Sequence, residues 1–89
     1  MNAKIITYDL CQPGRDYRGL INRIQQYPSA CRVCESSWLV ATTWSSQQIR
    51  DDLTQYIDPN DRLFVAELTG EAAWRNTLSS NESVKKALT

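Results

Sequence analysis

The 89-residue sequence predicts an α+β fold, with a four-stranded antiparallel sheet and two helices on one of its faces. The first observation is that short runs rich in β-branched and aromatic residues recur along the chain, as they do in strands. The second is that two other segments repeat their apolar residues every three or four positions, as in helices that bury one side. The third is their order, strand, helix, strand, strand, helix, strand, which fits one small domain.

The first strand is expected at residues 4–10, where the run Lys-Ile-Ile-Thr-Tyr-Asp-Leu lies. Apolar side chains alternate onto both of its faces, which is typical of a central strand covered above and below. Asp9 stands near its end, just before the turn residues at 12–14. A carboxylate in this position is either a candidate site for chemistry or a polar residue that ends the strand at the surface.

The first helix is expected at residues 15–27. Asp16 is a candidate N-cap or first-turn acid, and Pro28 ends the helix because the residue before a proline avoids helical geometry. The apolar side is formed by Tyr17, Leu20, Ile21, Ile24 and Tyr27. Arg15 and Arg18 lie away from that side, so they either hold phosphate groups bidentately or simply belong to an exposed helix start.

Two strands are expected next, at residues 31–35 and 38–42, joined as a tight hairpin. The second of them is apolar on both faces and is therefore also expected to be central. Cys31 and Cys34 have the spacing of a redox or zinc motif, but they lie in a strand-like run and a zinc ion would lack a fourth ligand. We therefore expect packed or half-exposed free thiols and no zinc.

The second helix carries the clearest start signal in the chain. Residues 45–48 (Ser-Ser-Gln-Gln) form a capping box, and Trp44 and Ile49 have the spacing of a hydrophobic staple. The buried side is expected to consist of Ile49, Leu53, Tyr56 and Ile57. Asp51 and Asp52 are adjacent, and neighbouring helix residues diverge by about 100°, so both are expected to face water rather than to form a two-carboxylate site.

The last strand is expected at residues 63–68, with a break at Thr69 and Gly70. Residues 72–74 could form a short extra strand or a docking segment, and residues 82–88 a terminal helix. With right-handed crossovers, the element order gives a ferredoxin-like βαββαβ domain over residues 1–70, followed by a C-terminal extension over residues 71–89.

Two helices cover only one face of such a sheet, whereas the first, third and fourth strands carry apolar residues on both faces. An apolar sheet face left uncovered marks an interaction surface. We therefore expect a homodimer that packs through the open sheet face. Its twofold symmetry is the commonest among oligomers.

The composition limits the possible chemistry. Ten basic residues balance ten acidic residues, and histidine is absent, which removes the commonest general base near neutral pH. Zero net charge argues against broad electrostatic capture of duplex nucleic acid. The sequence has neither an apolar run long enough to span a membrane nor a run typical of a signal peptide, and its cysteines are odd in number. We expect a cytoplasmic protein with reduced thiols and no membrane partner.

Several short motifs resemble one known family. The motifs are Tyr-Asp-Leu at 8–10, Pro-Gly-Arg-Asp-Tyr at 13–17, Glu-Ser-Ser-Trp-Leu-Val at 35–40 and Leu-Thr-Gly-Glu-Ala-Ala-Trp at 68–74. Over about residues 3–74 the chain resembles the small CRISPR-associated adaptation proteins, the second of the two core components. It is more similar to their stand-alone bacterial relatives, often labelled SinR-like, and distantly similar to virulence-associated D toxins, which are ribonucleases.

The resemblance implies a ferredoxin-like homodimer in which Asp9 binds Mg²⁺ at the dimer axis and supports cleavage of nucleic acid. The chain departs from the family in lacking a strongly basic surface and in its tail, residues 69–89. Two functions follow as hypotheses. One is a divalent-metal-dependent endonuclease acting on RNA or DNA through Asp9, with Arg15 and Arg18 holding the substrate. The other is a non-catalytic dimeric module that binds nucleic acid or protein.

Overall fold

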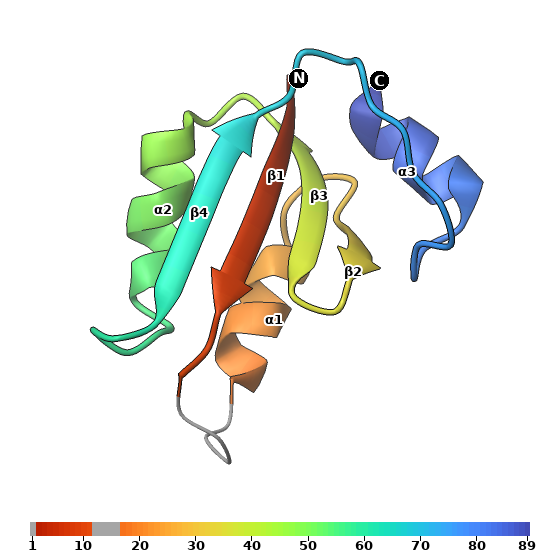
Figure 1. Cartoon of the computed structure of the whole chain (residues 1–89). Helices are drawn as coiled ribbons and strands as arrows, with labels where there is room; N and C mark the ends of the chain where they lie inside the picture. The colour runs from red at the N-terminus through yellow and green to blue at the C-terminus, as the bar shows by residue number, and fades with distance from the viewer. Residues whose placement is uncertain (1, 12–16) are drawn as a thin grey trace.

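The computed structural model describes residues 2–11 and 17–89 and contains one sheet and three helices (Figure 1). The fold is α+β, and its elements follow in the predicted order with one further helix at the end. In sequence they are β1 (Asn2–Asp9), α1 (Arg18–Gln25), β2 (Cys31–Cys34), β3 (Ser37–Thr42), α2 (Ser46–Thr54), β4 (Arg62–Glu67) and α3 (Asn81–Leu88).

The sheet has four antiparallel strands in the order β2-β3-β1-β4. The two central strands are β1 and β3, as predicted from their apolar residues on both faces. Ile6 of β1 lies between Trp38 of β3 and Val65 of β4, which fixes the register on both sides. This arrangement is compatible with a ferredoxin-like fold.

Helices α1 and α2 lie together behind the sheet in the view of Figure 1 and bury one of its faces. Alternate residues of β1 and β3 enter this core, because successive strand side chains point to opposite faces. Leu20 and Ile24 of α1 and Ile49 and Leu53 of α2 are all fully buried against it. The indole Nε1 of Trp38 donates to the Tyr8 hydroxyl at 3.1 Å, so the polar atoms of these two buried rings satisfy each other.

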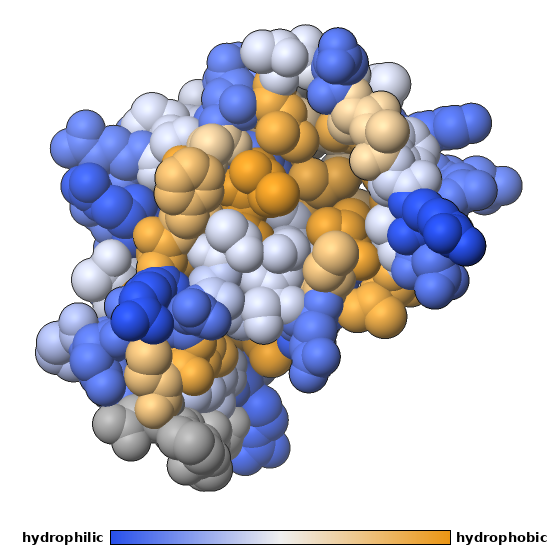
Figure 2. Space-filling model, in the orientation of Figure 1, coloured by the Kyte–Doolittle hydropathy of each residue, from blue (hydrophilic) through white to orange (hydrophobic). Residues whose placement is uncertain are grey.

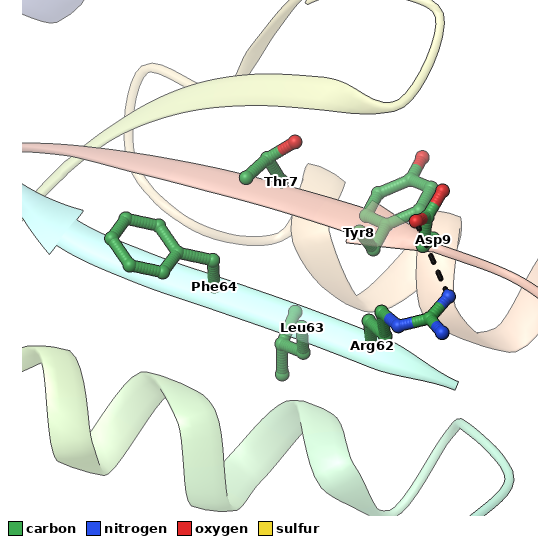
Figure 3. A pocket seen from close by; sticks show the side chains of 6 residues that line it. All are labelled: Thr7, Tyr8, Asp9, Arg62, Leu63 and Phe64. Atoms are coloured by element: carbon green, nitrogen blue, oxygen red, sulfur yellow. Dashed lines mark ion pairs between the residues drawn. The ribbon is translucent and has the colours of Figure 1, made fainter. Parts of the chain in front are cut away.

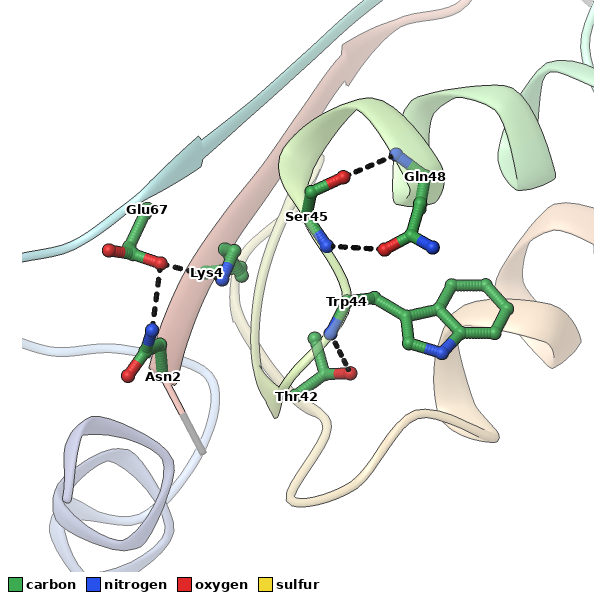
Figure 4. Close-up of polar contacts among 7 residues, drawn as sticks. All are labelled: Asn2, Lys4, Thr42, Trp44, Ser45, Gln48 and Glu67. Atoms are coloured by element: carbon green, nitrogen blue, oxygen red, sulfur yellow. Dashed lines mark hydrogen bonds and ion pairs between the residues drawn. The ribbon is translucent and has the colours of Figure 1, made fainter.

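A lysine lies buried at the other end of the same sheet face. The side chain of Lys4 is 3% exposed, and its ammonium group donates to Glu67 Oε1 at 2.9 Å (Figure 4). Asn2 donates to the same oxygen at 3.0 Å. The hydrogen bonds from Lys4 and then Asn2 lower the pKa of the Glu67 carboxyl. The lysine stem thus packs in the core while its charge reaches an exposed partner on the neighbouring strand.

The predicted start of α2 is confirmed. The Ser45 hydroxyl accepts from the Gln48 N–H at 3.1 Å, and the Gln48 side chain accepts from the Ser45 N–H at 2.8 Å (Figure 4). These two bonds satisfy backbone donors that the helix itself cannot pair.

The third helix covers part of the face that α1 and α2 leave open. Val84 and Ala87 of α3 are almost completely buried against Cys31 of β2 and Leu39 of β3. Half-buried apolar residues complete this second cluster, namely Ile5, Val33, Leu68, Trp74 and Leu88. The sequence argument for a homodimer assumed that a second chain must cover this face. Here the chain's own C-terminal segment packs over much of the apolar part of it and leaves Phe64 exposed.

Element boundaries differ from the predictions by a few residues. The expected helix start at residues 15–16, including Asp16 as its cap, lies outside the described residues. Within the described part, α1 ends at Gln25 rather than at residue 27, and Tyr56 and Ile57 lie beyond the end of α2. Residues 72–74 form a docking segment and not a strand, with Trp74 packed on the sheet.

The capping box gives a direct test of the α2 start. Ser45→Ala should lower the free energy of unfolding by about 0.5–2 kcal/mol, because it removes the acceptor for one helix N–H. Gln47→Ala, which changes an exposed residue in the same turn, is the control. The measurement is urea unfolding of both variants and the parent. Overlapping curves for parent and Ser45→Ala would contradict this assignment.

Candidate functional site

The part of the sheet face that α3 leaves uncovered carries polar residues and one exposed aromatic ring. Thr7 of β1 pairs in register with Ser37 of β3 on one side and with Phe64 of β4 on the other. Two residues further along β1, Asp9 pairs with Arg62 of β4. We call these five residues the open half of the sheet. Figure 2 shows the same side of the molecule, with hydrophobic residues gathered over the sheet and toward α3.

Asp9 and Arg62 face each other at the end of β1 (Figure 3). Arg62 Nη1 lies 3.6 Å from Asp9 Oδ2, and the two side chains are 76% and 74% exposed. They border a hollow of about 460 Å³, whose remaining lining residues are Thr7, Tyr8, Leu63 and Phe64. An exposed pair at this distance contributes little stability, so either group can exchange its partner for a ligand of opposite charge.

A half-buried set of hydrogen bonds holds this end of the sheet in place. The Asp61 carboxylate accepts from the Cys11 N–H at 2.8 Å, from the Asp58 N–H at 2.8 Å and from the Tyr17 hydroxyl at 3.0 and 3.1 Å. Asp61 precedes Arg62, and Cys11 follows Asp9 by two positions. The carboxylate therefore ties the end of β1 to the start of β4 and positions the exposed pair between them.

The residues predicted from the sequence are only partly brought together. Asp9 lies at the end of a central strand, as predicted. Arg15 lies outside the described residues. Arg18 is exposed at the first position of α1, on the helix side of the sheet, and is not among the described residues that line the hollow.

Arg62 and Phe64 were missed as site residues. The last strand was expected to begin at Leu63, which left Arg62 outside it, and Phe64 was counted as one apolar residue among several. The pairing of β1 with β4 sets Arg62 opposite Asp9 and Phe64 opposite Thr7, and no local pattern in the sequence reveals this register.

The cysteines are free, as expected, and lie in different surroundings. Cys31 is buried under α3, where its thiol contacts the Ser83 carbonyl oxygen at 3.8 Å, and burial raises the pKa of this thiol. Cys34 is exposed, and Cys11 is half-buried, with Arg62 Nη1 at 3.9 Å from its sulfur. Among the described residues, no group of three or more Cys, Asp or Glu side chains is placed to hold a metal ion.

The prediction that Asp52 faces water is wrong. Its side chain is 14% exposed and accepts from Arg23 Nε at 2.7 Å and from the Tyr27 hydroxyl at 2.5 Å. Burial and then this hydrogen bond raise the pKa of Tyr27. Arg23 also lies over the Tyr27 ring at 5.1 Å. The hydrogen bonds to Asp52 join α1 and the residues after it to α2, so this cluster is structural.

No protein-family model matches this chain, and no solved structure matches it. Within residues 2–11 and 17–89, no helix is long and apolar enough to cross a membrane.

The reactivity of Cys31 tests whether α3 packs over this thiol. Cys11→Ser/Cys34→Ser, which keeps Cys31 alone, should react with a thiol reagent at least about tenfold more slowly than Cys11→Ser/Cys31→Ser, which keeps Cys34, because burial and a raised pKa both suppress the thiolate. Adding Val84→Asp should release Cys31 and speed its reaction. The rates are followed by absorbance at constant pH. Equal rates for the two thiols would show that α3 does not cover Cys31.

Proposed function

We propose that this protein binds nucleic acid, and that Arg62 contacts a phosphate group at the end of the open half. The observation that carries the proposal is the exposed Arg62–Asp9 pair, held in position by Asp61 on the border of a hollow. A guanidinium group offers paired N–H donors that match two phosphate oxygens. The hollow gives a phosphodiester room to approach it from solvent.

The ion pair with Asp9 limits the affinity of Arg62 for a phosphate group, because the carboxylate and the phosphate compete for the same guanidinium group. Arg62 is paired with the Asp9 carboxylate in the free protein, and the chain has no net charge. Binding therefore depends on a local exchange of partners and not on a broad basic surface. A phosphate that displaces Asp9 gains a charge-assisted contact, while the released carboxylate remains fully solvated.

Two further lines support the proposal. The sheet order and the element order are compatible with a ferredoxin-like domain followed by a terminal helix. The chain also resembles the small CRISPR-associated adaptation proteins and their SinR-like relatives over residues 3–74, which carry the motifs around Asp9 and Trp38.

The cytoplasmic location expected from the sequence stays a prediction.

The proposal is tested by oligonucleotide binding in the presence of a chelator. Arg62→Gln should weaken binding and reduce the slope of log affinity against log salt by about 0.7, the value for one phosphate contact to a single strand. Asp9→Asn should tighten binding, because Arg62 then has no competing carboxylate. Arg50→Gln is the control, since Arg50 forms a similar exposed pair with Asp51 on α2, at 2.8 Å.

Fluorescence anisotropy over a salt series gives each affinity. Equal losses for Arg62→Gln and Arg50→Gln would show that only overall charge matters. Failure of the parent to bind any oligonucleotide at low salt would refute the proposed function.

Metal-dependent cleavage by a homodimer is the second candidate function, and the exposure of Asp9 favours it. Mg²⁺ is usually held by one or two carboxylates together with water and substrate phosphate, and Asp9 is an exposed carboxylate beside the guanidinium group of Arg62. Asp9 from each of two copies would hold the ion near a twofold axis. The ion, when bound, polarises a phosphate and activates water. Such a dimer would pair the open halves of two sheets.

This second function predicts a particle of about twice the chain mass of 10.2 kDa by light scattering at micromolar concentration. It also predicts cleavage in Mg²⁺ or Mn²⁺ that Asp9→Asn abolishes while the dimer persists, because the amide lacks the charge that holds the cation. Parent and variant are compared after identical purification. A monomer, or equal cleavage by parent and variant, would exclude this candidate.

A further inference from the structure

Phe64 is the large apolar residue of the open half, and it lies in an unusual setting. Its ring is 63% exposed, although it stands on a sheet face whose other large apolar residues pack in one cluster with α3. Figure 3 shows the ring on the side of the sheet that carries Thr7, while Leu63 points toward α2. The packing of the domain therefore does not use the face of this ring.

The neighbours of Phe64 are polar. Thr7, directly opposite on β1, shares a hydrogen bond of 2.9 Å with the Ser37 hydroxyl, and Thr7 Oγ1 also donates to the Ser36 carbonyl at 3.3 Å. A flat row of one aromatic ring and two hydroxyl groups thus crosses three strands. Arg62 lies two positions from Phe64 on the same strand face, a rise of about 6.8 Å.

We propose that this row, Ser37, Thr7 and Phe64, is a platform on which one base of a single-stranded nucleic acid stacks, while Arg62 holds an adjacent phosphate. This inference rests on the proposed function and names its substrate class. Aromatic rings bind unpaired bases through their π-faces, with little dependence on sequence. Bases in a duplex are stacked and paired, so their faces cannot reach a ring on a flat sheet.

The geometry favours this ligand over a protein surface. A protein partner needs a contiguous apolar patch with several buried anchors, and the open half offers one ring between two hydroxyl groups and an ion pair. The hydroxyl groups of Thr7 and Ser37 can exchange their mutual hydrogen bond for contacts to the polar edge of a base. The cation beside the ring complements the backbone charge of the same strand.

The test compares a short single strand carrying a fluorescent base analogue with the duplex of the same sequence. Phe64→Ala should weaken single-strand binding by about 5- to 150-fold, the range for removal of one stacking side chain, and leave duplex binding unchanged. Phe64→Trp should restore both the affinity and the quenching of the analogue. Leu78→Ala is the matched control, because Leu78 is 66% exposed and lies on the C-terminal segment against β2.

Loss of single-strand affinity in Phe64→Ala, rescued by Phe64→Trp and absent in Leu78→Ala, would support the inference. Unchanged binding in Phe64→Ala, with Arg62→Gln still defective, would overturn it and leave the proposed function standing. A parent that is dimeric and becomes monomeric in Phe64→Ala, with unchanged binding per chain, would assign the ring to a second copy and also overturn it. Binding of neither nucleic acid by the parent would refute both proposals together.

Discussion

The central position of β1 is the constraint on which the rest of the structure depends. Because β1 pairs with β3 and β4 at once, its register cannot shift without breaking two ladders. Strand alternation then sends Ile6 and Tyr8 into the core under α1 and α2, and Thr7 and Asp9 to the other face. A slip of one residue would bury Asp9 and expose Tyr8, so the register that stabilises the core also sets the position of the site.

The third helix divides the second face of the sheet by polarity. It packs on the apolar residues around Leu39 and leaves Phe64 and the Asp9–Arg62 pair exposed. A small domain buries too little surface to leave a whole apolar sheet face open. The terminal helix thus stabilises the fold while it leaves free the half of the face that carries charge, hydroxyl groups and an aromatic ring.

Local signals allowed much of the fold to be predicted, and long-range pairing accounts for what was missed. The capping box at Ser45 and the two-faced strand at residues 4–10 act through neighbours in sequence, and both were found. The position of α3 depends on contacts between Val84 and strands that lie about 50 positions earlier in the chain. No local sequence pattern reveals such contacts. Asp9 was found because it ends a strand. Arg62 and Phe64 became visible only when β4 was laid beside β1.

We propose that a single strand binds to the open half and not to the helix side or the α3 side. Amide chemical shifts recorded during titration with a single-stranded oligonucleotide, in the presence of a chelator, distinguish these surfaces. We expect saturable shifts at Thr7, Asp9, Ser37, Arg62 and Phe64 and none at the buried positions of α2 or α3. Shifts centred on α3 or on the α1–α2 surface, with the open half unchanged, would contradict it.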